Sequence, residues 1–419
     1  MKRYIHILTA ICAFQTICLT PAAAQKKTIE EIDYRRNSIY SILVNHTNEK
    51  YAANIADAFV GMPLPDKYND HDLSVKVLST ATEIKQASVD RFIERNHVAS
   101  HLVSRWFNRD IETGACDLNL IKERGLYNAS EFDRIIAEQT IRGNALLEDA
   151  GEDLIQNTFI IVNDIKYVDQ EAAGRAAGAA LQILFGLAGA FTSAYTGANV
   201  QNTFNLAGEG MNQMMQTLKG FKVKVHTYLY RLKWDEETAA RFYEQMYSDK
   251  PDEEKKTAFE NNRDLFKVEY VGSQLSSGKD ISFLGVNLDT PDAMVRKACM
   301  RAIDENVANL SRNFESFKVK VKLTNTMPIQ APIGLKEDVN EKTKYEVLLP
   351  EIVNGKTKYK HIAVIQPIPG MIWDNRYMAR EEGAVGSSLN YTTFTKVSGG
   401  EILPGMLIRE MGKNKNATK

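Results

Sequence analysis

The pattern of apolar and polar side chains, together with β-branched and aromatic content, predicts three strands in the first part of the chain. Residues 221–234 (FKVKVHTYLYRLKW) alternate Phe, Val and Val with Lys, Lys and His, which is typical of a half-buried strand. Residues 157–168 are rich in β-branched and aromatic side chains, and residues 38–44 have the same strand-like character. We therefore predict three strands in these ranges.

A three- and four-residue spacing of apolar side chains predicts helices elsewhere. This spacing continues through residues 80–107 and predicts one long helix, and Ser130 is the expected N-cap of a helix that ends near Leu147. The strongest helical pattern covers residues 291–314, with Pro291 in the first turn. Shorter predicted elements are two helices, at 235–247 and 251–262, and two strands, at 265–271 and 317–323.

From about Met327 onward, short apolar runs separated by turn residues predict a β-rich region. The predicted strands are at 345–349, 359–366, 371–377, 391–397 and 401–409. Together the patterns predict an α+β or α/β chain. A mixed-sheet α/β domain covers residues 25–326, a small β-barrel-like domain covers 327–410, and a disordered tail covers 411–419.

The first residues have the three parts of a secretory signal peptide. Two basic residues open the chain, and residues 5–19 form an uncharged, mostly apolar run. The small residues of Ala22-Ala23-Ala24 suit signal peptidase, so we expect cleavage after Ala24. A membrane anchor is disfavoured because the apolar run is short, and lipidation of Cys18 is disfavoured because no small residue precedes it. The leader, residues 1–24, predicts an exported protein of the periplasm or cell envelope.

Residues 172–208 form an Ala- and Gly-rich insertion, and no charged residue occurs from 176 to 208. Its candidate packing residues are Gly174, Gly178, Leu184, Phe185, Gly186 and Ala190. Small residues at this spacing let helices approach closely, in an oligomer or in a bilayer. The polar residues of its second half favour packing in the protein or in an oligomer. Membrane association through residues 176–208 is the alternative.

Charge and motifs argue against several partner classes. The chain of 419 residues has a formal net charge of -1, and no basic stripe with interleaved aromatics occurs, so we expect no nucleic-acid partner. Its glycines match neither a phosphate loop nor a dinucleotide fingerprint, so we expect no cofactor. Two cysteines remain after the leader, Cys116 and Cys299, and separate buried thiols are favoured over a disulfide.

Two groups of residues are candidate metal ligands. His97 and His101 are four residues apart on the predicted helix at 80–107 and would share one face. Asp70, His71 and Asp72 concentrate ligand atoms in a loop. The glutamate of the zinc-protease helix motif is absent after His97, so surface histidines and turn chemistry are the favoured interpretations.

Three short motifs follow one another between residues 102 and 168. A helix ends in Arg105-Trp106-Phe107, a short segment carries Glu123-Arg124-Gly125, and Gly151-Glu152-Asp153 leads into the predicted strand. In this order they resemble the periplasmic α/β domain of the curli-secretion channel family (CsgG-like). The resemblance implies an oligomeric channel in which the segment between two strands crosses the membrane. Residues 176–208 occupy that position here, although they have a helical rather than a strand-like pattern and the chain has no lipidation signal.

These observations predict an exported cell-envelope protein that acts as a non-enzymatic scaffold, assembly or secretion-associated factor. It would bind an envelope protein and self-associate as a homo-oligomer. The C-terminal region resembles the small barrel domains of envelope assembly proteins, and its candidate partner-binding residues are Trp373, Asp374, Asn375 and Arg376. No catalytic residue is predicted. The alternatives are a metal-dependent hydrolase that uses His97, His101 and the Asp70–Asp72 loop, and a membrane-inserted channel component.

Overall fold

The computed structural model describes residues 37–49, 51–64, 67–126, 141–169, 219–282, 290–318, 320–353, 356–381 and 383–411. The predicted signal peptide and the Ala/Gly-rich insertion, with its candidate packing residues from Gly174 to Ala190, lie outside these ranges. So do most of the predicted tail and the N-terminal part of the helix expected from Ser130 to Leu147.

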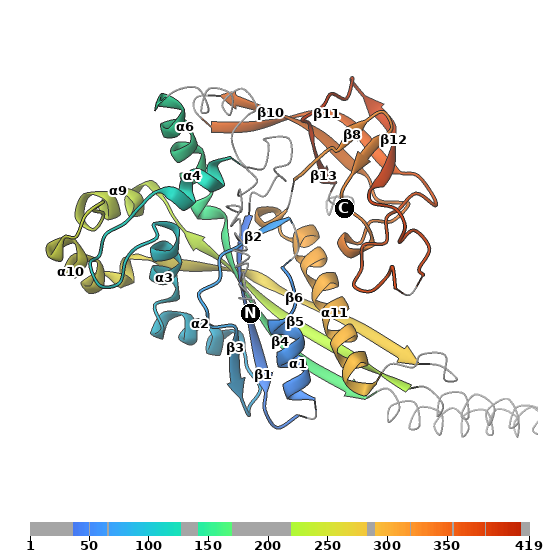
Figure 1. Ribbon diagram of the computed structural model, residues 1–419, viewed down its shortest axis with the longest axis horizontal. Helices are drawn as coiled ribbons and strands as arrows, with labels where there is room; N and C mark the ends of the chain where they lie inside the picture. Colours follow the sequence, from blue (N-terminus) through green and yellow to red (C-terminus); the bar gives the residue numbers. More distant parts are fainter. Residues whose placement is uncertain are drawn as a thin grey trace, which may run out of the picture. The chain divides into compact units, whose positions relative to one another are not determined.

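A mixed sheet, sheet A, forms the first part of the fold (Figure 1). Its strand order is β2-β1-β4-β5-β6, and β3 also pairs with β1. The strands are β1 (Asn37–His46), β2 (Tyr68–Asp70), β3 (Val77–Thr80), β4 (Thr158–Asp169), β5 (Lys219–Lys233) and β6 (Lys267–Ser282). Strand β1 is parallel to β2, β3 and β4, whereas β4, β5 and β6 are antiparallel. The three strands predicted at 38–44, 157–168 and 221–234 are confirmed, with ends that differ from the predicted ones by one or two residues.

Side chains alternate between the two faces of sheet A, and both faces are buried. On β5, Tyr228, Tyr230 and Leu232 belong to one hydrophobic cluster, whereas Val225 and Leu229 belong to the other. Helices cover each face because a sheet with two apolar faces must bury both. The first face is covered by α2 (Gln86–Arg95), α3 (Val98–Trp106), α9 (Glu236–Gln245) and α10 (Glu253–Asn261), and the second by α1 (Ala52–Val60) and α11 (Pro291–Asn313).

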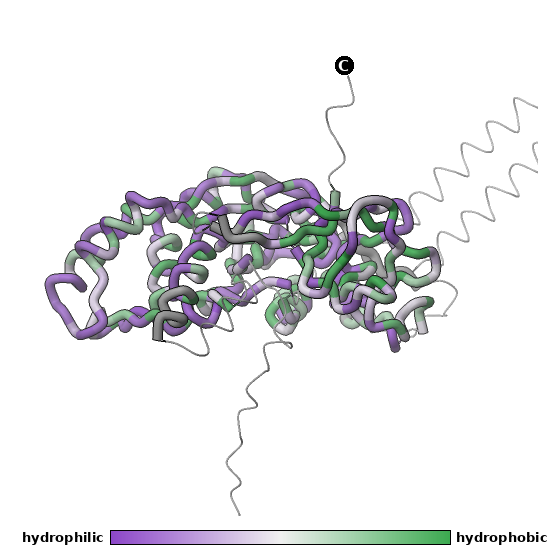
Figure 2. The backbone as a smooth tube through the Cα atoms, turned by 90° about the horizontal axis from the view of Figure 1, so that it is seen from above, coloured by the Kyte–Doolittle hydropathy of each residue, from purple (hydrophilic) through white to green (hydrophobic). Residues whose placement is uncertain are grey.

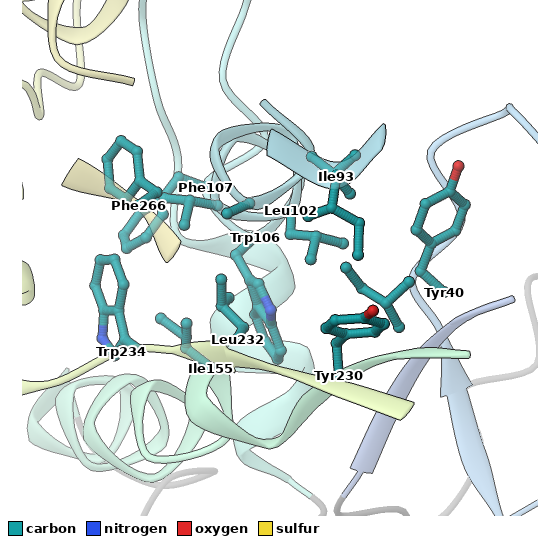
Figure 3. Close-up of a cluster of buried hydrophobic side chains, with 14 of the residues drawn as sticks. Tyr40, Ile93, Leu102, Trp106, Phe107, Ile155, Tyr230, Leu232, Trp234 and Phe266 are labelled. Carbon is teal, nitrogen blue, oxygen red and sulfur yellow. The ribbon is translucent and has the colours of Figure 1, made fainter. Parts of the chain in front are cut away.

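Trp106 is a central side chain of the first cluster. Figure 3 shows its indole pointing from α3 toward the strands, beside Leu232 and Ile155. The indole is fully buried, and its Nε1 donates a hydrogen bond of 2.7 Å to Thr158 Oγ1 on β4. This bond satisfies the only polar atom of the ring, so α3 is held firmly on the sheet. Helices α9 and α10, in contrast, are largely hydrophilic along the backbone tube (Figure 2).

The helix predicted for residues 80–107 is wrong as a single element. Strand β3 ends at Thr80, and two helices follow, α2 and α3, with His97 between them in the left-handed conformation at φ 47°. Asn96 Nδ2 donates to Phe92 O at 2.8 Å and so closes the end of α2. The apolar spacing continues across this turn because both helices lie on the same face of the sheet, which hides the break from the sequence pattern.

The strand predicted for residues 317–323 is also mostly absent. A 3-10 turn (Glu315–Phe317) contains its first residue, and among the residues of this range that the structure describes, only β7 (Val321–Lys322) is a strand. Phe317 turns into the second cluster, where its ring stacks 5.1 Å from Tyr68 and lies 4.9 Å from Phe159. The same pentapeptide, FKVKV, lies entirely in strand β5, whereas here its first residue, Phe317, lies in a turn and its last, Val321, in a strand, so tertiary packing overrides local preference.

The C-terminal region forms a second, antiparallel sheet that is curled into a half-barrel, sheet B. Its order is β7-β13-β10-β11-β12-β9-β8, with β8 (Asn325–Thr326), β9 (Ile329–Ala331), β10 (Tyr345–Val353), β11 (Lys356–Pro367), β12 (Thr392–Gly399) and β13 (Leu407–Glu410). The mixed α/β fold class with a β-rich C-terminal region is therefore confirmed. The predicted strand at 371–377 is wrong, because Trp373 makes only an isolated bridge with Gly334.

Helix α11 connects the two sheets. Thr290 caps it by accepting a hydrogen bond from Ala293 N, and Asn306 on its sheet A side bonds to Thr227 of β5. Toward sheet B, Asp304 lies 3.5 Å from the ammonium group of Lys336, and burial raises the pKa of Asp304 to about 6. A cavity of about 70 Å³ lies beside this pair, between α11 and sheet B residues that include Tyr345.

Helices α4 (Asn119–Gly125) and α6 (Ile141–Glu152) cross at two glycines. A Cβ atom on Gly125 would lie 2.0 Å from Leu147 O, and one on Gly151 would lie 1.9 Å from Ile121 O. Only glycine lets the two backbones approach this closely. The motifs Glu123-Arg124-Gly125 and Gly151-Glu152-Asp153 therefore meet in space.

We expect the substitution Gly151→Ala to destabilise the protein by about 2–3 kcal/mol, because the added methyl group forces the two helices apart. Urea unfolding followed by circular dichroism measures this change. Gly400→Ala is the matched control, since the nearest atom to its Cβ would be 3.6 Å away. Equal stability of the two variants would show that the crossing is not close-packed.

Candidate functional site

Of the two histidines predicted as metal ligands, His97 lies at the break between α2 and α3, and His101 lies in the first turn of α3. His97 Nδ1 is 3.5 Å from Asp264 Oδ1. The pKa of His101 is lowered by burial and by the nearby Arg263 and His97. Within the described part of the chain, no group of three or more His, Cys, Asp or Glu side chains is placed to hold a metal ion. The predicted metal-ligand set is therefore not brought together there.

The loop at residues 70–72 has a structural role in the fold. His71 is fully buried, its ring lies 5.2 Å from that of Trp106, and its Nε2 donates to Leu102 O at 2.9 Å. Burial lowers the pKa of His71 to about 3, so the ring is neutral at ordinary pH. The carboxylates of Asp70 and Asp72 accept backbone N–H groups two residues onward, which is the turn chemistry that the sequence favoured.

Arg124, in the motif Glu123-Arg124-Gly125, also has a structural role. Its guanidinium group donates to Ser38 Oγ at 2.7 Å and to Asp70 O at 3.1 Å, and it lies 5.4 Å from the centre of the Trp106 ring. Arg124 thus joins α4 to strand β1, the end of β2 and helix α3. Among the described residues, the motifs that carry the resemblance hold helices on the sheet.

The predicted partner-binding residues from Trp373 to Arg376 make mainly internal contacts. The Asp374 carboxylate is buried and accepts two hydrogen bonds from the Arg376 guanidinium group, at 2.9 and 2.8 Å. Asn375 Oδ1 accepts from Lys336 N, and Asn375 Nδ2 donates to Glu337 Oε2, each at 2.8 Å. Trp373 is half-buried, and its backbone oxygen accepts from Leu335 N. The loop therefore fixes the turn at Leu335–Glu337, and parts of Trp373 and Arg376 stay accessible.

A large groove lies beside helix α2 on the first face of sheet A. Its volume is about 580 Å³, within the range of protein binding sites. It runs between α2 and the last two strands, β5 and β6. The lining side chains are Gln86, Asp90, Ile93, Glu94, His97, Ala99, Tyr230, Arg263, Asp264, Phe266, Lys267, Val268 and Tyr270.

Two tyrosines form an aromatic part of the groove. The rings of Tyr230 and Tyr270, neighbours on β5 and β6, have centres 5.4 Å apart. Tyr230 is buried, and its hydroxyl donates to Asp90 Oδ1 at 2.6 Å. Burial and this carboxylate raise the pKa of Tyr230, so it stays a neutral donor. Tyr270 is 40% exposed, which makes its ring available to a ligand.

The groove lies beside the edge strand of sheet A, β6. In the part of the chain that the structure describes, β6 is the terminal strand and pairs with β5 on one side only. Leu275 lies opposite His226 further along β6 and is 63% exposed. An exposed strand edge with apolar side chains is a template for another extended chain. A bulge at Val271 and Gly272 interrupts this edge, so the straight part beside the groove covers only the start of β6.

Helix α2 buries few of its side chains. Only Val89 and Ile93 among its residues are fully buried. A second hollow of about 330 Å³, lined mainly by apolar side chains such as Val44, Leu78 and Phe92, lies on the β3 side of the helix. Helix α2 therefore has a hollow on each of its two sides.

Another polar pair was missed by the sequence reasoning. His46 Nε2 and Asp164 Oδ1 are 2.5 Å apart, and both side chains are buried. His46 ends strand β1, and Asp164 lies in the middle of β4, where the parallel pairing with β1 ends, close to an ion pair between Lys166 and Glu83. The groove was missed as well, although Asp90 and Glu94 share one helix face. Only the packing of α2 beside β6 brings residues 86–99 and 263–270 together.

Comparison with known proteins adds no relative: no protein-family model matches the chain, and a search of curated proteins gives no match. None of the helices within the described ranges combines the length and the apolar character needed to cross a membrane.

His71 predicts a pH dependence of stability. Since its pKa is lowered on folding, the unfolded chain takes up a proton first as the pH falls below about 6.5. Stability from this residue is complete above that pH and is lost progressively toward pH 3, by at most about 1.4 kcal/mol per pH unit. We expect urea midpoints at pH 7, 6 and 5 to fall more steeply for the wild type than for His71→Gln, which does not titrate. Parallel curves would contradict this prediction.

Proposed function

We propose that this protein is an exported, non-enzymatic scaffold or assembly factor of the cell envelope, and that it binds an extended segment of a partner protein in the groove between α2 and β6. The observation that carries the proposal is the groove itself, about 580 Å³ in volume and open beside the terminal strand of sheet A. Extended segments bind in such places by adding to a strand edge and placing alternate side chains in pockets.

The character of the groove favours binding over bond-making chemistry. Its lining combines apolar and aromatic side chains with charged groups, which is typical of recognition sites. Tyr230 and Asp90 are held to one another, and His97 faces Asp264. Such paired groups provide orientation and specificity for a partner.

The proposed location and assembly rest on sequence features. The leader at residues 1–24 supports export, and the order of motifs around Arg124 and Gly151 supports a relationship to envelope secretion proteins. Residues 172–208, inserted between β4 and β5, supply a candidate surface for self-association. A metal-dependent hydrolase is the weaker proposal, since its candidate ligands do not converge in the described structure.

The proposed binding site predicts where a partner can be captured. A photoreactive amino acid at position 270, in the groove, should give a discrete crosslinked product in cell envelopes. Position 376 tests the C-terminal loop, and position 111, whose isoleucine is 78% exposed outside the groove, is the control. A product from position 270 alone supports the proposal. Products only from position 376, or equal products from all three positions, would move the binding site away from the groove.

Export has its own test. We expect the periplasmic or envelope fraction to contain a shortened protein whose N-terminal residue is Gln25, because signal peptidase would cleave after Ala24. Mass spectrometry of the purified chain reads this end directly. Full-length protein that starts at Met1 in the cytoplasm would exclude an envelope function.

A further inference from the structure

The α2 wall of the groove carries two carboxylates one helical turn apart. Asp90 and Glu94 both line the groove, and residues four apart lie on the same helix face. Like charges at this spacing weaken a helix slightly. Asp90 Oδ1 accepts the Tyr230 hydroxyl at 2.6 Å, which fixes the direction of its side chain. A carboxylate has room for further donors, so Asp90 can accept a second hydrogen bond from a ligand.

An aromatic surface lies next to these carboxylates. The Tyr230 hydroxyl touches Asp90, and the Tyr270 ring is 5.4 Å from that of Tyr230 and 40% exposed. The face of an aromatic ring attracts a cation, and the attraction is stronger where water is partly excluded. A carboxylate beside such a ring is a combination that suits an ammonium or guanidinium group.

The wall opposite α2, at residues 263–270, has charged side chains of both signs, and two of them pair with other residues of the protein. Arg263 pairs with Glu260 one turn earlier, and Asp264 lies 3.5 Å from His97. Lys267 is exposed at the start of β6. The negative charge of the groove is thus concentrated on α2, where Asp90 and Glu94 face the space.

We infer that the groove recognises a lysine or arginine side chain of the extended partner segment, held between the Asp90 and Glu94 carboxylates and the ring of Tyr270. This inference rests on the proposed function and names the chemistry of its partner. A groove of about 580 Å³ has room for such a side chain together with its neighbours along the segment. The charged head of the side chain lies at α2, and its aliphatic stem covers Val268 and Tyr270.

The test uses four pools of fluorescent heptapeptides with random flanks and a fixed central residue, which is Arg, Lys, Gln or Glu. Fluorescence anisotropy with the mature full chain measures their affinity. The Arg and Lys pools should bind at least about tenfold more tightly than the Glu pool, because charge complementarity changes affinity on this scale. The difference should shrink at high salt.

Substitutions then locate the recognition. Glu94→Gln and Asp90→Asn remove charge but keep shape, and the amide oxygen that Asp90→Asn introduces still accepts the Tyr230 hydroxyl. Both variants should therefore fold and bind the Arg pool about tenfold more weakly. Tyr270→Leu should weaken it about threefold. Glu237→Gln, at an exposed position of α9, is the control and should not change binding.

The outcomes separate the inference from the proposed function. Equal binding of all four pools, with crosslinking from position 270 intact, overturns cation recognition and leaves the groove as the partner site. Binding of the Arg pool that Glu94→Gln and Asp90→Asn do not weaken places the cation elsewhere and also overturns the inference. If no pool binds and position 270 gives no crosslink, both the inference and the proposed function fail.

Discussion

The burial of helix α11 on two sides is the constraint on which the rest of the structure depends. One side packs into the second cluster of sheet A through small and apolar residues such as Ala298, Cys299 and Ile303. Its other side meets sheet B through Asp304 and through Arg312, which forms an ion pair with Glu410 at 2.9 Å. A helix in this position keeps few exposed residues, and each polar group that it buries needs a partner.

A chain of buried hydrogen bonds shows how this requirement is met. Asn163 of β4 donates to Ser41 Oγ of β1 at 3.1 Å and accepts from Thr227 of β5 at 2.7 Å. Thr227 in turn accepts from Asn306 of α11, whose side-chain oxygen accepts from Ser276 of β6 at 2.9 Å. Four strands and the helix are thereby held in one register, because any shift would leave buried polar groups unpaired. This network holds the second face of sheet A together, and the groove lies on the first face.

Prediction from the sequence succeeded where a local pattern of residue types alone determines the element. The strand around Val225 was found because apolar and polar side chains alternate along it, and those around Ile42 and Ile161 were found because they are rich in β-branched and aromatic residues. Helix α11 was found because its apolar residues repeat at helical spacing after Pro291. The predictions failed where contacts between residues far apart in the sequence determine the structure. Phe317, for example, lies in a turn and not in the predicted strand, because its ring packs in the core against Tyr68 and Phe159. The groove was hidden for the same reason, since no local pattern places Asp90 beside Tyr230, 140 residues further along the chain.

Hydrogen exchange tests most directly whether an extended segment of a partner lies along β6 beneath α2. Backbone amides of β6 that point away from β5 should exchange rapidly in the free protein, since no described strand pairs with that edge. Once the Arg-centred peptides or the crosslinked partner are bound, amides from Lys267 to Tyr270 and on α2 should be protected, whereas those of sheet B should not change. Unchanged exchange in β6 and α2 under saturating ligand would contradict the account.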